Sequence, residues 1–179
     1  MNKKTMYIIV AALVVVIIVA GAAAYVLSNN ANNGTTNPTP TPTTNPTVNI
    51  PNATSLVFSV NDTSQGTTTT YQFKAANMGT ADIALRVDVP GCNAGANFTY
   101  VFKAATQSAW NSTNSGAFVT DKFASAWPLW GNMWSGYVTK LDSWNSTATY
   151  SYTASNGDAI KIFDISVNPT IPSSTFQTS

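Results

Sequence analysis

The stretch Asp82–Val89, which reads DIALRVDV, decides the fold of this protein because apolar and polar side chains alternate along it. Successive side chains of a β-strand point to opposite faces of a sheet, so one face of this strand is apolar and the other polar. Such one-sided alternation is typical of an antiparallel sheet that buries one face and leaves the other in water. We therefore expect a mainly β fold whose curved antiparallel sheet is half-barrel or sandwich-like.

The same alternation continues on both sides of this stretch. It predicts further strands around Leu56–Val60, Tyr71–Ala75, Phe98–Phe102, Thr147–Ala154 and Ile160–Val167. We expect the turn-rich segment Asn61–Gly66 to separate the first two of these strands. We expect Asn156-Gly157 to supply the positive φ angles of a tight hairpin turn between the last two.

One segment has helical spacing instead. Aromatic and aliphatic residues recur every three or four positions from Phe123 to Trp144, which predicts a Trp-rich amphipathic helix over the buried face of the sheet. Asp121 is the expected N-cap. A kinked or two-piece helix is predicted by Pro128, Gly131 and Gly136. The tryptophans either close the core or line a cavity or a sugar-stacking surface.

The N-terminal part of the chain indicates where this domain is located. Tyr7–Leu27 is an unbroken apolar run of 21 residues, long enough for a helix to cross a hydrocarbon core of about 30 Å. Lys3 and Lys4 precede the run and the next charged residue is Asp62, which predicts a cytoplasmic N-terminus and an extracytoplasmic C-terminal domain. A cleaved signal peptide is the alternative, because Ala20–Ala24 contains the small residues of a cleavage site.

Composition then divides the chain into four parts. Residues 1–6 are the cytoplasmic N-terminus, 7–27 the transmembrane anchor, 28–54 a disordered stalk rich in Thr, Pro and Asn, and 55–179 the exported β-rich domain. The stalk lacks apolar periodicity and cannot bury enough surface to offset the entropy of the chain. The exported part has the length of one domain with a single core.

Charge and residue content exclude several classes of function. Residues 55–179 carry six Lys or Arg against seven Asp, without a basic stripe, so nucleic acid is not an expected partner. The chain has no His and no Glu, which removes the commonest general bases and metal ligands. We therefore expect no enzyme activity, no metal and no cofactor. The single cysteine, Cys92, is either a small loop or core residue or a reactive or intermolecular thiol.

Six N-glycosylation acceptor motifs lie in the chain, and chance alone predicts about four or five. They begin at Asn33, Asn52, Asn61, Asn97, Asn111 and Asn145. Glycans on the exported side would supply the solvation that the 8% of charged residues do not. These asparagines are therefore the glycosylation candidates.

The order of several motifs resembles the lipoprotein-sorting carrier superfamily, the outer-membrane lipoprotein carrier type. These motifs are Arg86-Val87-Asp88, Phe98-Thr99-Tyr100-Val101-Phe102 and Ser108-Ala109-Trp110 before the Trp-rich stretch, and the terminal Ile165–Phe176, ISVNPTIPSSTF, is similar to the ends of many members. The resemblance covers most of Ser55–Phe176 and implies a curved antiparallel half-barrel whose helices cap a hydrophobic cavity for acyl chains, without enzymatic activity. The positions that match the inward, ligand-lining set are Phe73, Leu85, Tyr100, Phe102, Trp127, Trp130 and Trp134. The exported domain is shorter than in that family and tethered, which argues against a shuttling role.

Two functions follow from these features, and a third is disfavoured. The first is a membrane-tethered, non-enzymatic module that binds a lipid or another apolar ligand under the tryptophan lid. The second is a glycosylated cell-envelope module that contacts surface polymers or proteins through exposed aromatics, with a filled core and no small-molecule ligand. An enzyme would need a cleft in which Asp, Lys or Ser side chains converge.

Overall fold

The computed structural model describes residues 50–179, apart from the side chains of Asn93 and Ala94. The expected anchor, most of the expected stalk and the Asn33 acceptor motif lie outside these residues. Within the described part, none of the helices combines the length and the apolarity that crossing a membrane requires.

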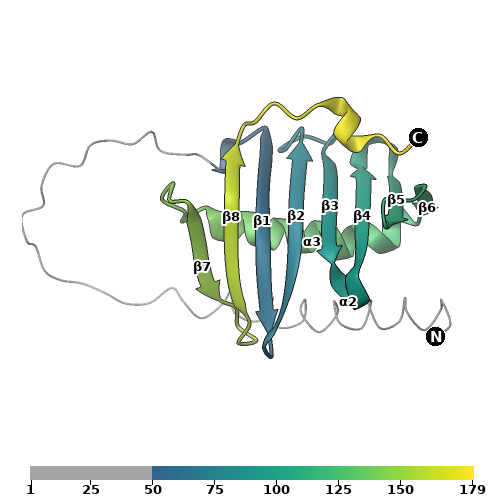
Figure 1. Ribbon diagram of the computed structural model, residues 1–179. Helices are drawn as coiled ribbons and strands as arrows, with labels where there is room; N and C mark the ends of the chain where they lie inside the picture. The colour runs from purple at the N-terminus through teal and green to yellow at the C-terminus, as the bar shows by residue number, and fades with distance from the viewer. Residues whose placement is uncertain (1–49) are drawn as a thin grey trace, which may run out of the picture.

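The described chain forms one curved, open, antiparallel sheet of eight strands with a long helix on one face (Figure 1). The strand order is β6-β5-β4-β3-β2-β1-β8-β7. The strands are β1 (Ser55–Ser64), β2 (Thr67–Ala76), β3 (Ala84–Gly91), β4 (Ala96–Lys103), β5 (Ser108–Thr113), β6 (Val119–Asp121), β7 (Thr149–Thr153) and β8 (Ala159–Val167). The helix is α3 (Phe123–Leu141), and the short elements are η2 (Ile50–Asn52), α2 (Cys92–Gly95), η3 (Ala104–Thr106) and η4 (Ser173–Phe176). The predicted mainly β class with one covering helix is confirmed.

The connectivity explains why α3 lies across the strands. The helix leaves β6 at one edge of the sheet and leads to β7 at the opposite edge. A connection between the two edges must pass over the strands between them, and α3 does so on one face (Figure 1). The apolar side of the helix is thereby placed on the apolar face of the sheet, where both exclude water.

The first hairpin differs from the prediction in the length of its strands. β1 continues to Ser64, so most of the expected turn Asn61–Gly66 is strand, and only Gln65 and Gly66, with φ of 49° and 80°, form the turn. Asn61–Ser64 of β1 pair with β2 on one side, and Asn61–Thr63 also pair with β8 on the other. Two ladders of backbone hydrogen bonds outweigh the local turn preference of Asn, Asp and Ser.

The last hairpin has the predicted strands but a longer loop. The five residues Ala154–Asp158 separate β7 from β8, and Gly157 has a positive φ of 91° whereas Asn156 does not. A bulge follows within β8 at Asp164, whose φ is 54°, where the register with β1 shifts. The extra residue lets Ile165 and Val167 pack on the same core as Ile162.

The helix is continuous from Phe123 to Leu141, so the two-piece alternative is wrong, while a kink stays a prediction. Pro128 lies in the second turn, where the absence of its N–H removes one intrahelical hydrogen bond without ending the helix. The predicted N-cap is also wrong: Lys122 occupies that position without a side-chain cap. Asp121 ends β6 instead, and its Oδ1 accepts a hydrogen bond from the Lys122 backbone N at 2.7 Å.

The folded unit begins before the expected boundary at Ser55. Ile50 is 1% exposed and Ala53 is 4% exposed, and Ile50 belongs to the main hydrophobic core. At the other end, η4 packs on β3, where Arg86 Nη1 donates a hydrogen bond to the Thr175 carbonyl at 3.2 Å. The last residues of the expected stalk are therefore part of the domain.

Two glycines of α3 provide a matched test of how tightly the helix is packed. A Cβ on Gly131 would lie 3.0 Å from the Trp127 ring, whereas a Cβ on Gly136 would meet nothing within 4 Å. We expect Gly136→Ala to raise the free energy of unfolding by about 0.5–1 kcal/mol, because alanine is the better helix former. Gly131→Ala should gain less or lose stability because Trp127 is held against Phe123 and Phe102. Urea denaturation of both variants measures the difference, and an equal gain would contradict the close packing of Trp127.

Candidate functional site

Ten aromatic side chains fill the space between the sheet and α3, and we call them the aromatic layer. The sheet contributes Phe58, Tyr71, Phe73, Tyr100 and Phe102, and the helix contributes Phe123, Trp127, Trp130, Trp134 and Tyr137. Phe58 stacks on Trp134 with ring centroids 5.2 Å apart, and Tyr100 lies 4.5 Å from Trp130. Phe123 stacks on Trp127 at 5.3 Å. These distances are those of directly packed aromatic pairs.

The seven predicted ligand-lining residues all lie in or beside this layer. Phe73, Leu85 and Phe102 have no exposed surface, and Trp130 and Trp134 are 5% exposed. Tyr100 and Trp127 are half-buried. Their position between sheet and helix agrees with the inward face expected for them, while their role in binding a ligand stays a prediction.

The other two tryptophans have different surroundings. Trp144 follows the helix, and its indole Nε1 donates to the Thr147 carbonyl at 2.8 Å. Trp110 lies on the opposite face of the sheet, where Lys103 Nζ sits 5.4 Å from the ring centroid. Helical spacing predicts which side of α3 is apolar, but not that the helix ends before Trp144.

Sequence reasoning missed Asp62, which lies on the buried face. Its position follows from the alternation of Leu56, Phe58 and Val60, which continues through Asp62 because β1 does not end at Asn61. Asp62 is 5% exposed, and its Oδ1 has no hydrogen-bond partner among the described residues. Extending the alternation of inward-facing residues by two positions beyond Val60 would have predicted that Asp62 is on the buried face.

Four other oxygen-bearing side chains interact electrostatically with this carboxylate, and together with it we call them the Asp62 cluster. They are Asp158, Tyr71, Tyr137 and Tyr152. Burial, and then the negative charge of Asp158, raise the pKa of Asp62 to about 6. Burial, and then the charge of Asp62, raise the pKa of Tyr71 to about 12 and raise the pKa values of Tyr137 and Tyr152.

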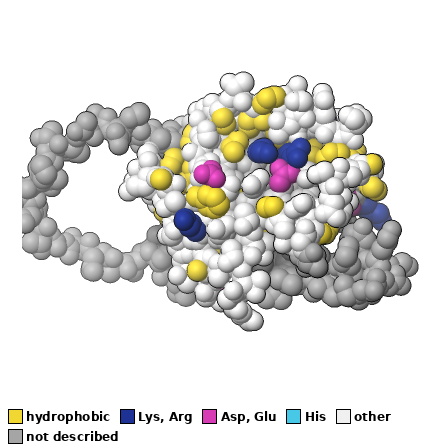
Figure 2. Space-filling model, in the orientation of Figure 1, with side chains coloured by type: hydrophobic (Ala, Val, Ile, Leu, Met, Phe, Trp, Pro, Cys, Tyr) yellow, Lys and Arg dark blue, Asp and Glu magenta, His cyan; other side chains and the backbone are white. Residues whose placement is uncertain are grey.

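A half-buried carboxylate, Asp88, lies on the outer face of the sheet and is fully compensated. Arg86 Nη2 lies 2.9 Å and Lys74 Nζ 3.2 Å from its oxygens, and Thr99 Oγ1 donates to it at 2.8 Å. Burial raises the pKa of Asp88, but the hydrogen bonds from Arg86 and Thr99 and the two positive charges outweigh it and lower the pKa overall. Figure 2 shows charged side chains gathered on this otherwise mostly uncharged face.

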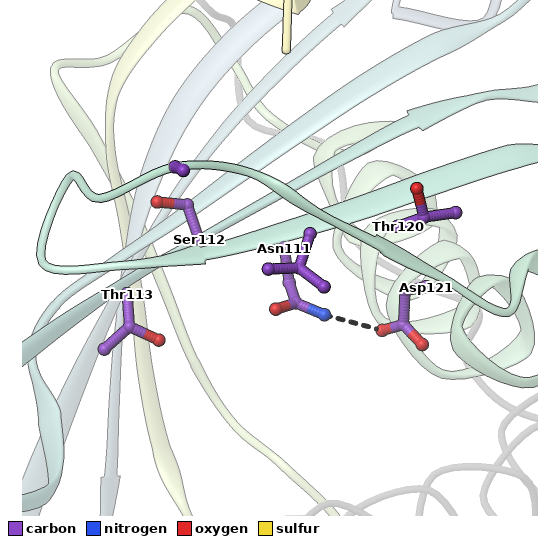
Figure 3. Close-up of a pocket in the computed structure, with 7 residues that line it drawn as sticks. Asn111, Ser112, Thr113, Thr120 and Asp121 are labelled. Carbon is purple, nitrogen blue, oxygen red and sulfur yellow. Dashed lines mark hydrogen bonds between the residues drawn. The ribbon is translucent and has the colours of Figure 1, made fainter. Parts of the chain in front are cut away.

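A shallow hollow of about 530 Å³ lies at the β5–β6 hairpin (Figure 3). It is lined by Asn111, Ser112, Thr113, Ala117, Val119, Thr120 and Asp121. Asn111 Nδ2 donates to Asp121 Oδ2 at 3.1 Å across the hairpin, and Val119 is 62% exposed. Asp121, the one carboxylate in this lining, is already hydrogen-bonded to Asn111, so the hollow does not bring together several free catalytic groups.

The acceptor asparagines differ in their exposure and in the hydrogen bonds of their side chains. Asn52, Asn97 and Asn145 are exposed. Asn61 is half-buried and accepts from Thr70 Oγ1 at 2.9 Å, and the side-chain nitrogen of Asn111 is already engaged by Asp121. Asn97 Oδ1 accepts a hydrogen bond from the Gly91 backbone N at 2.9 Å. Occupancy of each motif stays a prediction.

Metal-ligating and thiol groups are sparse in residues 50–179. That part of the chain holds no group of three or more His, Cys, Asp or Glu side chains arranged for a metal ion. Cys92 is half-buried, and burial raises the pKa of its thiol. A thiol with a raised pKa is a poor nucleophile at neutral pH.

No protein-family model, curated protein or solved structure matches this chain. The resemblance to the lipoprotein-sorting carriers therefore stays a prediction. Conclusions about function depend on the geometry of the aromatic layer, the two sheet faces and the Asp62 cluster.

Truncation of Trp134 distinguishes a packed core from a ligand cavity. If the ring is a core element, Trp134→Ala should lower the free energy of unfolding by about 3–5 kcal/mol, because it removes contacts with Phe58 and Phe73 and leaves a void. Trp110→Ala, on the outer face, should cost only about 1–2 kcal/mol. Denaturant unfolding of both variants gives the comparison, and a loss at Trp134 no larger than that at Trp110 would indicate a loosely filled interior.

Asp62 and Asp88 should affect stability with opposite dependence on pH. Because the pKa of Asp62 is raised on folding, its ionisation destabilises the folded state as pH rises from about 4 to about 6, by up to about 3 kcal/mol. Asp62→Asn should therefore gain stability relative to wild type across that range. Asp88→Asn should instead be less stable than wild type by a constant amount above about pH 4, and the difference should shrink as pH falls below about 4, because protonation of Asp88 removes the stabilisation that its lowered pKa provides. Unfolding curves from pH 3.5 to 8 test both, and parallel curves for wild type and Asp62→Asn would show that Asp62 is not buried as described.

Proposed function

We propose that residues 50–179 form a membrane-tethered, non-enzymatic interaction module of the cell envelope, in which the aromatic layer is a structural core. The direct ring-to-ring packing of this layer carries the proposal. Phe58, Phe73 and Trp134 contact one another with centroids 5.2–5.9 Å apart and are nearly inaccessible. A ligand beneath the helix would have to separate these rings, at a cost comparable to opening a core of similar size. Binding by the outer surfaces needs no such opening.

The outer face of the sheet is the surface best suited to a partner. It is rich in Ser, Thr and Asn hydrogen-bonding groups, and it carries two half-buried aromatic rings, Trp110 on β5 and Phe163 on β8. A lysine Nζ lies over one face of each ring, Lys103 at 5.4 Å and Lys161 at 5.9 Å from the ring centroid, which leaves the other face for a ligand. Accessible aromatic rings among hydroxyl groups suit a surface polymer whose sugar units stack and accept hydrogen bonds.

The carboxylates of the domain favour a binding role over catalysis. Asp88 is held by Arg86, Lys74 and Thr99, and Asp62 lies beneath the helix. A general acid or base must reach its substrate within hydrogen-bond distance. The tether itself is proposed from the apolar run Tyr7–Leu27 alone.

Native mass spectrometry combined with binding to isolated cell envelopes tests this proposal. We expect the exported fragment, residues 48–179 from cells that supply lipid, to show the mass of the polypeptide and any glycans without an extractable apolar adduct. We expect it to sediment with envelopes, and the double variant Trp110→Ala/Phe163→Ala to sediment at least several-fold less. Trp144→Ala is the control, because it also removes a tryptophan but not from the outer face.

Two results would overturn the proposal. An extractable apolar adduct that persists through purification would favour the lipid-binding function under the tryptophan lid. Equal envelope binding by the double variant and by wild type would remove the outer face from the interaction.

A further inference from the structure

The Asp62 cluster lies at one end of the aromatic layer, where five elements meet. Asp62 comes from β1, Tyr71 from β2, Tyr152 from β7, Asp158 from the turn before β8, and Tyr137 from α3. In the sheet, Asp62 pairs with Ile160 of β8 and with Thr69 of β2, and Ile160 pairs with Tyr152 of β7. The fold thus gathers oxygen-bearing side chains from distant parts of the chain around one carboxylate.

Nothing in the described part of the chain compensates the charge of Asp62. A buried carboxylate without a hydrogen bond or an opposite charge is among the most costly groups in a protein interior. Asp62 is 5% exposed and its Oδ1 has no partner, and both ion pairs found in residues 50–179 involve Asp88 instead. The same fold neutralises one carboxylate with its own side chains and leaves the other uncompensated.

Asp158 adds a second negative charge to the uncompensated charge of Asp62. Asp158 is 7% exposed, and Asn156 Nδ2 donates to its Oδ2 at 2.6 Å, which fixes its orientation. Lys140 of α3 is near this end, but its Nζ sits 5.5 Å from the centroid of the Tyr152 ring rather than in an ion pair. Asp158 lies two residues before Ile160, the β8 residue that pairs with Asp62, so the two buried carboxylates are on neighbouring segments and the charge of Asp158 acts on Asp62.

We infer that the Asp62 cluster is a binding site for a hard, oxygen-preferring metal cation, with Asp62 and Asp158 as the direct ligands. Cations of the Ca²⁺ type bind carboxylates, hydroxyls and water, and they accept irregular shells of six to eight oxygens. Mg²⁺ demands a near-ideal octahedron and gives up its water reluctantly, so it should bind less well here. A bound cation would hold β1, the β7–β8 turn and the C-terminal half of α3 together.

Luminescence of Tb³⁺, a Ca²⁺ substitute, tests the site on the full chain in a non-ionic detergent. The ion would lie close to Tyr71, Tyr137 and Tyr152, so excitation of the tyrosines should sensitise its emission at pH 7.5. Ca²⁺ should displace Tb³⁺ and should raise Tm of the wild type by about 5 °C or more at saturating concentration. At pH 5 protons on Asp62, whose pKa is raised to about 6, compete with the metal, and both effects should shrink.

Three variants make the result specific. Asp62→Asn should abolish the sensitised emission and the Ca²⁺-dependent rise in Tm, and Asp158→Asn should weaken binding at least about tenfold. Asp82→Asn is the matched control, because Asp82 is exposed in the β2–β3 loop, at the opposite end of the strands. Should Asp62→Asn fail to fold, the Tb³⁺ emission and the Ca²⁺-dependent rise in Tm are compared between Asp158→Asn and Asp82→Asn.

Two outcomes would overturn the inference. The first is a wild-type protein whose Tm and Tb³⁺ emission do not respond to either metal at pH 7.5. The second is sensitised emission that is unchanged in both Asp62→Asn and Asp158→Asn, since the ion would then be bound elsewhere. Neither outcome bears on binding by the outer face, because Trp110 and Phe163 lie on the other side of the sheet.

Discussion

The packing of one helix across an open eight-stranded sheet is the interaction on which this structure depends. The sheet does not close on itself, so its apolar face would be exposed to water without α3. The helix covers that face because it must travel from β6 at one edge to β7 at the other. Large rings bridge the distance between the two layers, and Phe58, Phe73 and Trp134 form the centre of that contact. Burial of such rings supplies most of the free energy that a domain of this size without a disulfide can gain.

The carboxylates on the two faces of the sheet have opposite electrostatic surroundings. On the outer face, Asp88 is surrounded by Arg86, Lys74 and Thr99, so its ionised form stabilises the fold. On the inner face, Asp62 is buried beside a second carboxylate, and ionisation is disfavoured. A polar network that is fully satisfied adds rigidity, whereas a lone buried charge is retained at a cost in stability. This contrast is the reason for assigning a ligand to the inner carboxylate and none to the outer one.

The aromatic layer, the Asp62 cluster and the outer face differ in the role that each is suited to. The centre of the layer is filled by rings in direct contact, which supports a structural role for most of the predicted ligand-lining residues. The polar end of the layer, at Asp62 and Asp158, has chemistry that the centre lacks. The outer face, with Trp110 and Phe163, is the surface that we propose for a large partner.

The sequence by itself determined the β class, the strands from Tyr71 to Phe102, and the apolar side of α3, because alternation and helical spacing are local consequences of side-chain direction. It also placed the seven inward residues between sheet and helix. Only the tertiary structure decided that β1 extends to Ser64, that Ile50 is part of the core and that α3 is continuous through Pro128. Each of these depends on partners distant in the chain: two flanking ladders for β1, a core for Ile50 and a packed sheet face for α3. Asp62 belongs to the same group, since its burial beside Asp158 results from the pairing of β1 with β8, which no local pattern of residues specifies.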